Sequence, residues 1–280
     1  MATWDAKVTI LVDNEAGAGF QSEFGLALWV ENRGTRFLFD TGQEHGVLRE
    51  NAEQLGIDPG AADYVILSHG HYDHCGGLAE LLTRGCHSSV HCHPSVVQPR
   101  YSIRNKEVKA IQMPRAAMAA LDHHPQELVH WVQQPVRLTK TVGLTGPIPR
   151  ETLYEDVGGP FYLDQEGRRP DPIDDDLALW VDTDDGLIVC VGCAHAGVVN
   201  TLRHVQRLNN GKRIRAVIGG FHLRSADRRR MDSTIAALDE FNPERIVPCH
   251  CTGTDAVQSL HEVFGKRCWP GMTGMTCVFD

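Results

Sequence analysis

Residues 64–74 read Tyr-Val-Ile-Leu-Ser-His-Gly-His-Tyr-Asp-His and carry most of the structural information in this chain. The apolar run 64–67 predicts a short buried strand, and the residues after it predict a tight loop. Four side chains of that loop can ligate a metal: His69, His71, Asp73 and His74. Imidazoles and a carboxylate on one loop can turn inward together, so the stretch predicts a site for one or two cations. The alternative, a His-rich surface loop, would require neither a buried strand before it nor the Gly-Gly pair at 76–77.

The composition restricts the class of partner. The 280 residues suffice for one large domain or two small ones. Lys and Arg total 27 against 36 Asp and Glu, which gives a net charge of −9. A chain this acidic has no general attraction for phosphate polymers, so we expect a small-molecule substrate and no nucleic-acid partner. The basic run at 228–230 is interleaved with polar and acidic residues and predicts a solvated helix start.

The N-terminal sequence and the cysteines indicate a compartment. The chain starts Met-Ala-Thr-Trp-Asp-Ala-Lys, which is no secretory leader, and it contains no apolar run long enough for a bilayer. We therefore expect a cytoplasmic protein with no membrane partner. Nine Cys, several of them near His, favour reduced thiols close to a metal site over a disulfide framework. A homodimer is expected only because homodimers are common.

Short runs rich in Val, Ile and Leu recur along the chain, and each predicts a strand. They lie at 8–12, 25–30, 36–39, 64–67, 177–181, 187–191, 215–218 and 246–247. Apolar residues at helical spacing follow several of the later runs, beginning near Val198, Ile235 and Val257. Strand-rich stretches combined with crossover helices predict an α/β sandwich of two mixed β-sheets flanked by helices.

Residues from about 95 to 150 interrupt this alternation with weakly periodic helix and several Pro. A long excursion between regular elements is typical of a lid over a site or of a surface elaboration. The aromatic and Arg side chains within it favour a lid that contacts an anionic or planar ligand.

Three further predicted strands each finish in a His, at His195, His222 and His250. Ligands collect at the carboxyl ends of strands in open α/β sheets, so these residues and the 69–74 loop predict one shared site. A centre of two metals draws about six protein ligands from several loops. We predict His195 and His250 as ligands, and His222 as a catalytic residue that faces the substrate or supports a ligand.

A second cluster, at 86–93, contains Cys86, His87, His91, Cys92 and His93. Its sequence predicts an alternating strand on which His91 and His93 share one face and Cys92 takes the other. Side chains on opposite faces cannot converge, so no second metal site is predicted here.

The His-x-His-x-Asp-His run, the upstream Asp40-Thr-Gly42 and the His-bearing strand ends resemble the metallo-β-lactamase superfamily from about Val8 to the end of the chain. Four segments are similar to the branch related to 7,8-dihydropterin-6-methyl-4-(β-D-ribofuranosyl)aminobenzene-5'-phosphate synthase. They are Gly-Cys-Ala-His-Ala-Gly-Val-Val-Asn at 192–200, Gly-Gly-Phe-His-Leu at 219–223, Pro-Cys-His-Cys-Thr-Gly at 248–253 and Gly-Pro-Ile-Pro-Arg at 146–150.

The resemblance implies a αββα sandwich formed by a single domain, 1–280, with the metal site at one edge of the two sheets. It further implies two divalent metal ions: zinc is expected, with iron or manganese as alternatives. His69, His71 and His195 would hold one ion, and Asp73, His74 and His250 the other. The superfamily often bridges its metals with an Asp where this chain has Cys193. Three alternatives follow: Cys193 is an additional ligand, His195 alone provides the ligand at that position, or only one metal binds tightly. Thiolate ligation would favour zinc.

Three functions remain open. The first is metal-dependent hydrolysis of an ester, phosphoester or related bond in a small anionic metabolite, with Asp73 orienting the activated water. The second, implied by the resemblance, is a transferase or synthase step on a pterin or ribosyl phosphate. The proposed substrate contacts would then be Tyr101, Arg104, Arg115 and Arg150. The third is a metal-binding redox or sensor protein. The acidic residues 174–176 could help to compensate for the bridging Asp that the chain lacks at Cys193, but they are expected to form a solvated turn.

Overall fold

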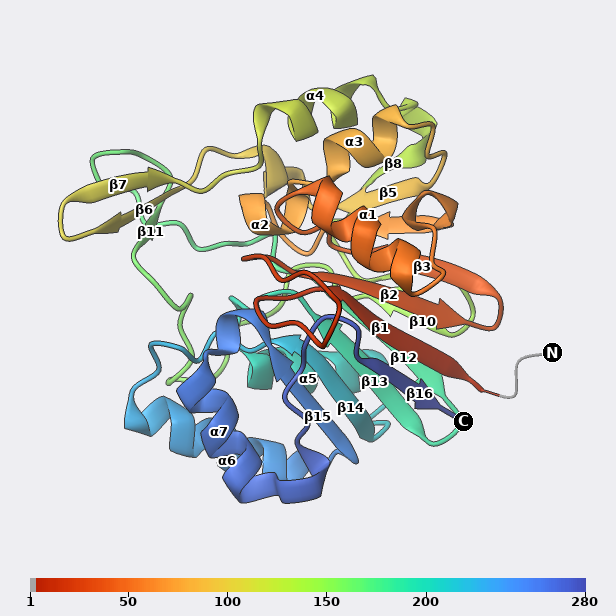
Figure 1. Ribbon diagram of the computed structural model, residues 1–280. Coiled ribbons are helices and arrows are strands. Elements are labelled where there is room, and N and C mark those ends of the chain that lie inside the picture. The colour runs from red at the N-terminus through yellow and green to blue at the C-terminus, as the bar shows by residue number, and fades with distance from the viewer. Residues whose placement is uncertain (1–3) are drawn as a thin grey trace.

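The computed structural model describes residues 4–280 and consists of two packed mixed β-sheets with helices on both outer faces (Figure 1). The first sheet has the strand order β16 (Thr276–Phe279), β1 (Ala6–Val12), β2 (Ala27–Asn32), β3 (Thr35–Phe39), β4 (Tyr64–Ile66), β5 (Ser89–Cys92) and β8 (Val129–Trp131). The second has the order β15 (Arg245–Cys249), β14 (Ile214–Gly220), β13 (Gly186–Val191), β12 (Ala178–Thr183), β10 (Val142–Leu144) and β9 (Val136–Arg137). Each strand predicted from an apolar run is present.

Helices from the two halves of the chain cover different sheets (Figure 1). The first sheet is covered by α1 (His45–Gln54), α3 (Leu78–Thr83) and α4 (Arg115–His123). The second is covered by α5 (Val198–Leu208), α6 (Arg228–Phe241) and α7 (Thr254–Phe264). The predicted αββα sandwich is therefore confirmed. Within residues 4–280, no helix has the length and apolar character needed to cross a membrane.

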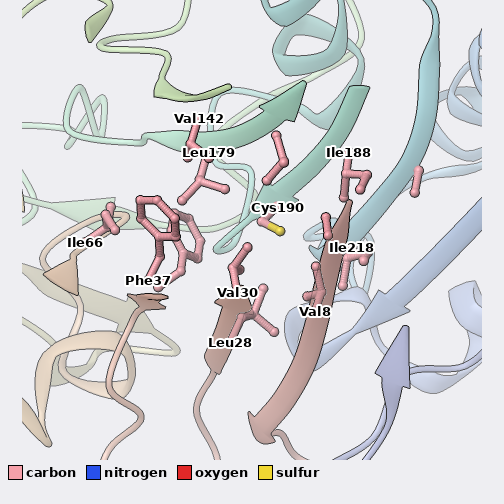
Figure 2. Close-up of a cluster of buried hydrophobic side chains, with 14 of the residues drawn as sticks. Val8, Leu28, Val30, Phe37, Ile66, Val142, Leu179, Ile188, Cys190 and Ile218 are labelled. Carbon is pink, nitrogen blue, oxygen red and sulfur yellow. The ribbon is translucent and has the colours of Figure 1, made fainter. Parts of the chain in front are cut away.

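The strands are apolar on both faces because each sheet lies between another sheet and a layer of helices. In β2, Leu28 and Val30 contact the core between the sheets, whereas Ala27 and Trp29 contact the helical layer. Figure 2 shows Leu28, Val30 and Phe37 of the first sheet facing residues of the second, such as Ile188. This two-sided burial explains why the strands are continuous apolar runs in the sequence.

The segment 95–150, expected to be a lid, is divided among three places. Its helix α4 packs on the first sheet, β8 extends that sheet, and β9 and β10 extend the second. Its remaining hairpin, β6 (Tyr101–Arg104) and β7 (Glu107–Ala110), joins β11 (Phe161–Tyr162) in a small third sheet. This small sheet projects from one end of the sandwich beside α2 (Tyr72–Cys75), as Figure 1 shows.

Candidate metal centre

The predicted ligand loops meet at one edge of the sandwich because they all follow the carboxyl ends of strands. In the first sheet, β4 leads into residues 69–74. In the second sheet, β13, β14 and β15 run parallel, so their carboxyl ends lie at the same edge. Cys193 and His195 follow β13, His222 follows β14, and His250 follows β15. The site therefore combines residues far apart in the sequence.

His69, His71 and His195 form one buried group, and their candidate ligand atoms lie within 4.8 Å of one another. The ring of His195 is fixed from behind, because its Nδ1 donates to the carbonyl oxygen of Val157 at 2.7 Å. His69 Nδ1 donates to Ser68 Oγ at 2.9 Å. Bonds of this kind select the tautomer and turn the opposite ring nitrogen toward the centre.

Asp73, His74 and His250 form a second buried group, again with ligand atoms within 4.8 Å of one another. His74 Nδ1 donates to Asp40 Oδ2 at 2.7 Å, and His250 Nδ1 donates to Asn14 Oδ1 at 3.0 Å. The Nε2 atom of His250 consequently faces Asp73, at 3.5 Å from its Oδ2. The Asp40-Thr-Gly segment thus contributes a carboxylate that orients a histidine of the site.

Cys193 lies between the two groups. Its Sγ is 3.2 Å from His74 Nε2, and it shares one possible ligand set with His69 and His74 and another with His195 and His222. The preceding residue, Gly192, lets the loop approach Ser68 closely, because a Cβ at this position would lie 2.1 Å from Ser68 Oγ. Cys193 therefore occupies the position between the two ligand groups, where the bridging Asp was expected from the resemblance.

The donor set fits a divalent metal. Within residues 4–280, no hydrogen-bond partner is found for the buried Nε2 atoms of His71, His195 and His250. Buried polar atoms are normally satisfied, so unpartnered imidazole nitrogens on three residues of the two candidate groups fit a role in metal ligation. Burial lowers the pKa of His69, His71 and His195 well below the usual value, which keeps these rings neutral as metal ligation requires.

The second group carries the charge of the site. Burial alone would lower the pKa of His74, but the carboxylates of Asp40 and Asp73 raise it to about 9. Burial acts on Asp73 in the opposite sense, yet His74 and His250 lower the pKa of its carboxyl below the usual range. Asp73 is therefore an anion near neutral pH and a hard oxygen donor among imidazoles.

The expectation of a solvated acidic turn at 174–176 is wrong for two of its three residues, because Asp175 and Asp176 are buried. Asp175 Oδ2 accepts from the Gly70 N–H at 2.8 Å, between the two histidines of the first group. Asp176 Oδ2 accepts from the Ala196 N–H at 2.6 Å, next to His195. Both carboxylates brace ligand loops, a role that the local sequence does not signal.

A pocket of about 420 Å³ opens onto the metal site. Its floor contains His71, Asp73, Cys193, His222 and His250. Its walls bring together the apolar side chains of Phe24, Tyr72, Ile111 and Phe161 and charged side chains, of which three are basic and one is acidic: Arg104, Lys109, Arg224 and Glu107. The volume suits a small metabolite, and such walls can bind a ligand that has both a planar part and an anionic part.

The structure separates the four residues predicted to contact substrate. Arg104 lines the pocket together with Ser102, the residue two positions before it on the same face of β6. Tyr101, on the other face, accepts a hydrogen bond from Gln165 Nε2 at 3.3 Å. Arg115 is exposed at the start of α4. Neither Tyr101 nor Arg115 belongs to the described lining of this pocket.

Arg150 is also outside the described lining of the pocket, because its guanidinium is directed at backbone carbonyls. Its Nη1 donates to the His195 carbonyl at 2.6 Å, and its Nη2 donates to those of Pro172 and Ile173. Its position supports the loop of His195 rather than a direct contact with a ligand in this pocket.

The cluster at 86–93 forms no candidate metal group among the described residues. β5 ends at Cys92, and His93 caps the turn that follows by accepting from the Ser95 N–H at 3.1 Å. The buried ring of His91 stacks on that of His130, with centroids 4.4 Å apart. All nine cysteines are buried and free, as predicted for reduced thiols.

The chain belongs to the metallo-beta-lactamase superfamily, because the model of that family matches residues 22–204. It is 30% identical to 7,8-dihydropterin-6-methyl-4-(beta-D-ribofuranosyl)-aminobenzene-5'-phosphate synthase of Methanocaldococcus jannaschii, over 92% of this chain and 91% of that protein. An uncharacterized protein of the same organism is 29% identical over 91% of this chain and 94% of its own. Among solved structures, Tm1679, described as a metal-dependent hydrolase of the beta-lactamase superfamily, is 29% identical, with a TM-score of 0.81 and coverage of 97% and 98%.

Proposed function

We propose that this protein is a metal-dependent hydrolase that cleaves an ester, phosphoester or related bond in a small anionic metabolite. The observation that carries the proposal is the convergence of two buried ligand groups, His69 with His71 and His195, and Asp73 with His74 and His250, beside a pocket with basic side chains in its lining. His69, His71 and His195 would hold one ion. Asp73, His74 and His250 would hold a second, with Cys193 between them.

The bound ions would supply the chemistry that side chains cannot supply alone. A divalent ion lowers the pKa of water from about 15.7 towards about 7 and stabilises negative charge on a carbonyl or phosphoryl oxygen. The chain's own residues position the reactants. Asp73 would orient the attacking water, since its carboxylate is ionised and lines the pocket.

His222 is suited to deliver a proton to the leaving group. It lines the pocket, its ring centroid is 4.5 Å from that of His195, and its Nδ1 has no hydrogen-bond partner in the described part of the chain. Arg104, Lys109 and Arg224 bind the anionic part of the substrate from the rim. Phe24 and Tyr72, with ring centroids 6.5 Å apart, hold its planar or apolar part.

The experiment measures metal content by mass spectrometry together with hydrolysis of a panel of aryl phosphomonoesters, phosphodiesters and carboxylic esters. We expect close to two equivalents of a divalent metal, and about one in His250→Ala, because one ligand group is lost. His71→Ala and Asp73→Ala should lower kcat by about 10²- to 10⁴-fold with the fold retained. His123→Ala is the control, since His123 is exposed on α4. Undiminished turnover by the metal-stripped protein would refute the proposal.

A synthase or transferase step on a pterin or ribosyl phosphate is the second candidate, and it is favoured by the 30% identity to the synthase of M. jannaschii. The same pocket would then hold the pterin ring between aromatic walls and the phosphate at its basic rim. Saturable quenching of pterin fluorescence, weakened in Phe24→Ala, would support this candidate. Absence of pterin binding by the metal-loaded protein would count against it. One equivalent of iron, unaffected by His250→Ala, would instead favour a redox or sensor protein.

A further inference from the structure

Two cysteine thiols meet at one side of the candidate metal centre. Cys193 follows β13, and Cys251 lies in the short turn His250–Thr252 that follows β15. The Sγ atoms of both cysteines and a ring nitrogen of His250 lie within 4.8 Å of one another, and all three residues are buried. Cys251 also lines the pocket. In the sequence, it is one of the cysteines that lie beside a histidine.

The backbone around Cys251 holds its thiol in this place. The N–H of His250 donates to Asp13 Oδ1 at 2.7 Å, which anchors the start of the turn. The hydroxyl of Thr252 donates to the Cys249 carbonyl at 2.7 Å and accepts from the Phe221 N–H at 3.0 Å, which anchors its end. Cys251 is therefore fixed between two anchored residues.

The end of β14 leaves space for the sulfur. A Cβ at Gly220 would lie 2.5 Å from Cys251 Sγ, so a side chain there would displace the thiol. Cys251 Sγ lies 3.7 Å from the Cys193 carbonyl oxygen, a long contact even for a weak thiol donor, and it also interacts with the side chains of Cys193 and His222. The nine cysteines all lie within the described residues, and Cys193 and Cys251 are the two that belong to candidate ligand groups.

We infer that Cys251 is a further thiolate ligand of the metal ion that His250 binds, where it acts with Cys193. The inference rests on the proposed function in requiring a metal at that position. Each thiol releases its proton to solvent when its sulfur binds the ion. Two sulfurs and the imidazole of His250 form a soft donor set, which selects zinc or cobalt over manganese.

Cobalt(II) provides a direct test, because thiolate-bound cobalt has a near-ultraviolet charge-transfer band, whereas its visible ligand-field bands require only that cobalt be bound. We expect the charge-transfer band to fall by about half in Cys251→Ser and in Cys193→Ser, and to vanish in the double variant. Cys268→Ser is the matched control, since Cys268 is a buried cysteine outside the candidate ligand groups. Cys251→Ala replaces Cys251→Ser if circular dichroism shows that the serine variant is unfolded.

The outcomes distinguish this inference from the function on which it rests. An unchanged charge-transfer band in Cys251→Ser, with normal ligand-field bands, would overturn the role of Cys251 and leave the metal site intact. The absence of all cobalt bands would overturn both. A thiol titration of the denatured protein should find all nine cysteines reduced. Seven thiols in the wild type and eight in Cys251→Ser would mean that the pair forms a disulfide, which also overturns the inference.

Discussion

The guanidinium of Arg100 donates two hydrogen bonds to the carboxylate of Asp175, at 2.9 Å and 2.6 Å, and both side chains are fully buried. A second carboxylate, that of Asp171, lies 3.0 Å from Arg100 Nε. Because Asp175 also accepts from the Gly70 N–H, the pair joins the segment before β6 to the loop of His69 and His71. The charge pair thus braces the metal site from behind.

Arg100→Ala should therefore lower the free energy of unfolding by about 3–5 kcal/mol, because it leaves two buried carboxylates without their cation. Denaturant unfolding of the metal-loaded protein measures the change. Arg228→Ala is the control: the Arg228 side chain is 94% exposed, and its loss should change stability by less than about 0.5 kcal/mol. Equal stabilities of the two variants would contradict the bracing role of Arg100.

Asp40→Asn should weaken metal binding with little change of fold. The carboxylate of Asp40 accepts from both Ser68 Oγ and His74 Nδ1 at 2.7 Å, and an amide has one fewer accepting oxygen for these bonds. Loss of such a supporting carboxylate typically lowers metal affinity about 10- to 100-fold. Competition with a chromogenic chelator measures the affinity. Asp63→Asn, at a half-exposed carboxylate paired with Arg36, should leave it unchanged.

Arg104→Ala should raise KM for anionic substrates, whereas Arg115→Ala should not. Arg104 lines the pocket, and Arg115 is exposed on α4 outside the described lining. A hydrogen bond to a charged group contributes about 1.5–3 kcal/mol, which corresponds to a KM increase of roughly 10- to 150-fold. Steady-state kinetics on an anionic substrate and a neutral analogue checks this. Equal effects of the two substitutions would show that the anion binds elsewhere.

His91 should make stability depend on pH in the acid range. Burial, with a contribution from the adjacent His130, lowers the pKa of His91 to about 4, from an unfolded value near 6.5. The unfolded chain therefore binds a proton at a higher pH than the folded protein. Above pH 6.5, His91 is neutral in both states and its full contribution to stability is present. Between about pH 6.5 and about pH 4, the unfolded chain binds a proton that the folded protein does not, so the free energy of unfolding falls as the pH decreases.

His91→Phe keeps a planar ring between Tyr64 and His130 and removes the titrating group. The wild type should lose stability relative to this variant by on the order of 1 to 3 kcal/mol between pH 7 and pH 4. Parallel unfolding curves, recorded for both proteins after chelation of metal, separate this effect from loss of metal. A constant difference across the pH range would show that His91 does not titrate as described.

Much of the architecture could be predicted because it depends on short-range patterns. The apolar runs that become β1, β4 and β13 are buried on both faces, and each is bounded by polar or Gly residues. The convergence of the 69–74 loop with His195 and His250 follows from strand order, since ligand loops at carboxyl ends of strands meet at one edge.

The supporting residues could not be predicted, since their partners lie far away in the sequence. Arg100 and Asp175 are 75 positions apart, and neither has a local motif. An acidic run such as 174–176 is usually solvated, whereas here a buried cation and loop amides hold Asp175 and Asp176 inside. Cys251 was also missed as a candidate ligand, although its position directly after His250 offered a signal.

The candidate ligands come from both layers of the sandwich: His69 to His74 follow a strand of the first sheet, whereas His195 and His250 follow strands of the second. An ion held by both sets would act as a reversible cross-link between the two halves of the chain. Such a cross-link, like a disulfide, would restrict the unfolded ensemble most when the joined residues are far apart in sequence. Supply of metal would then control the cohesion of the two layers as well as catalysis at their shared edge.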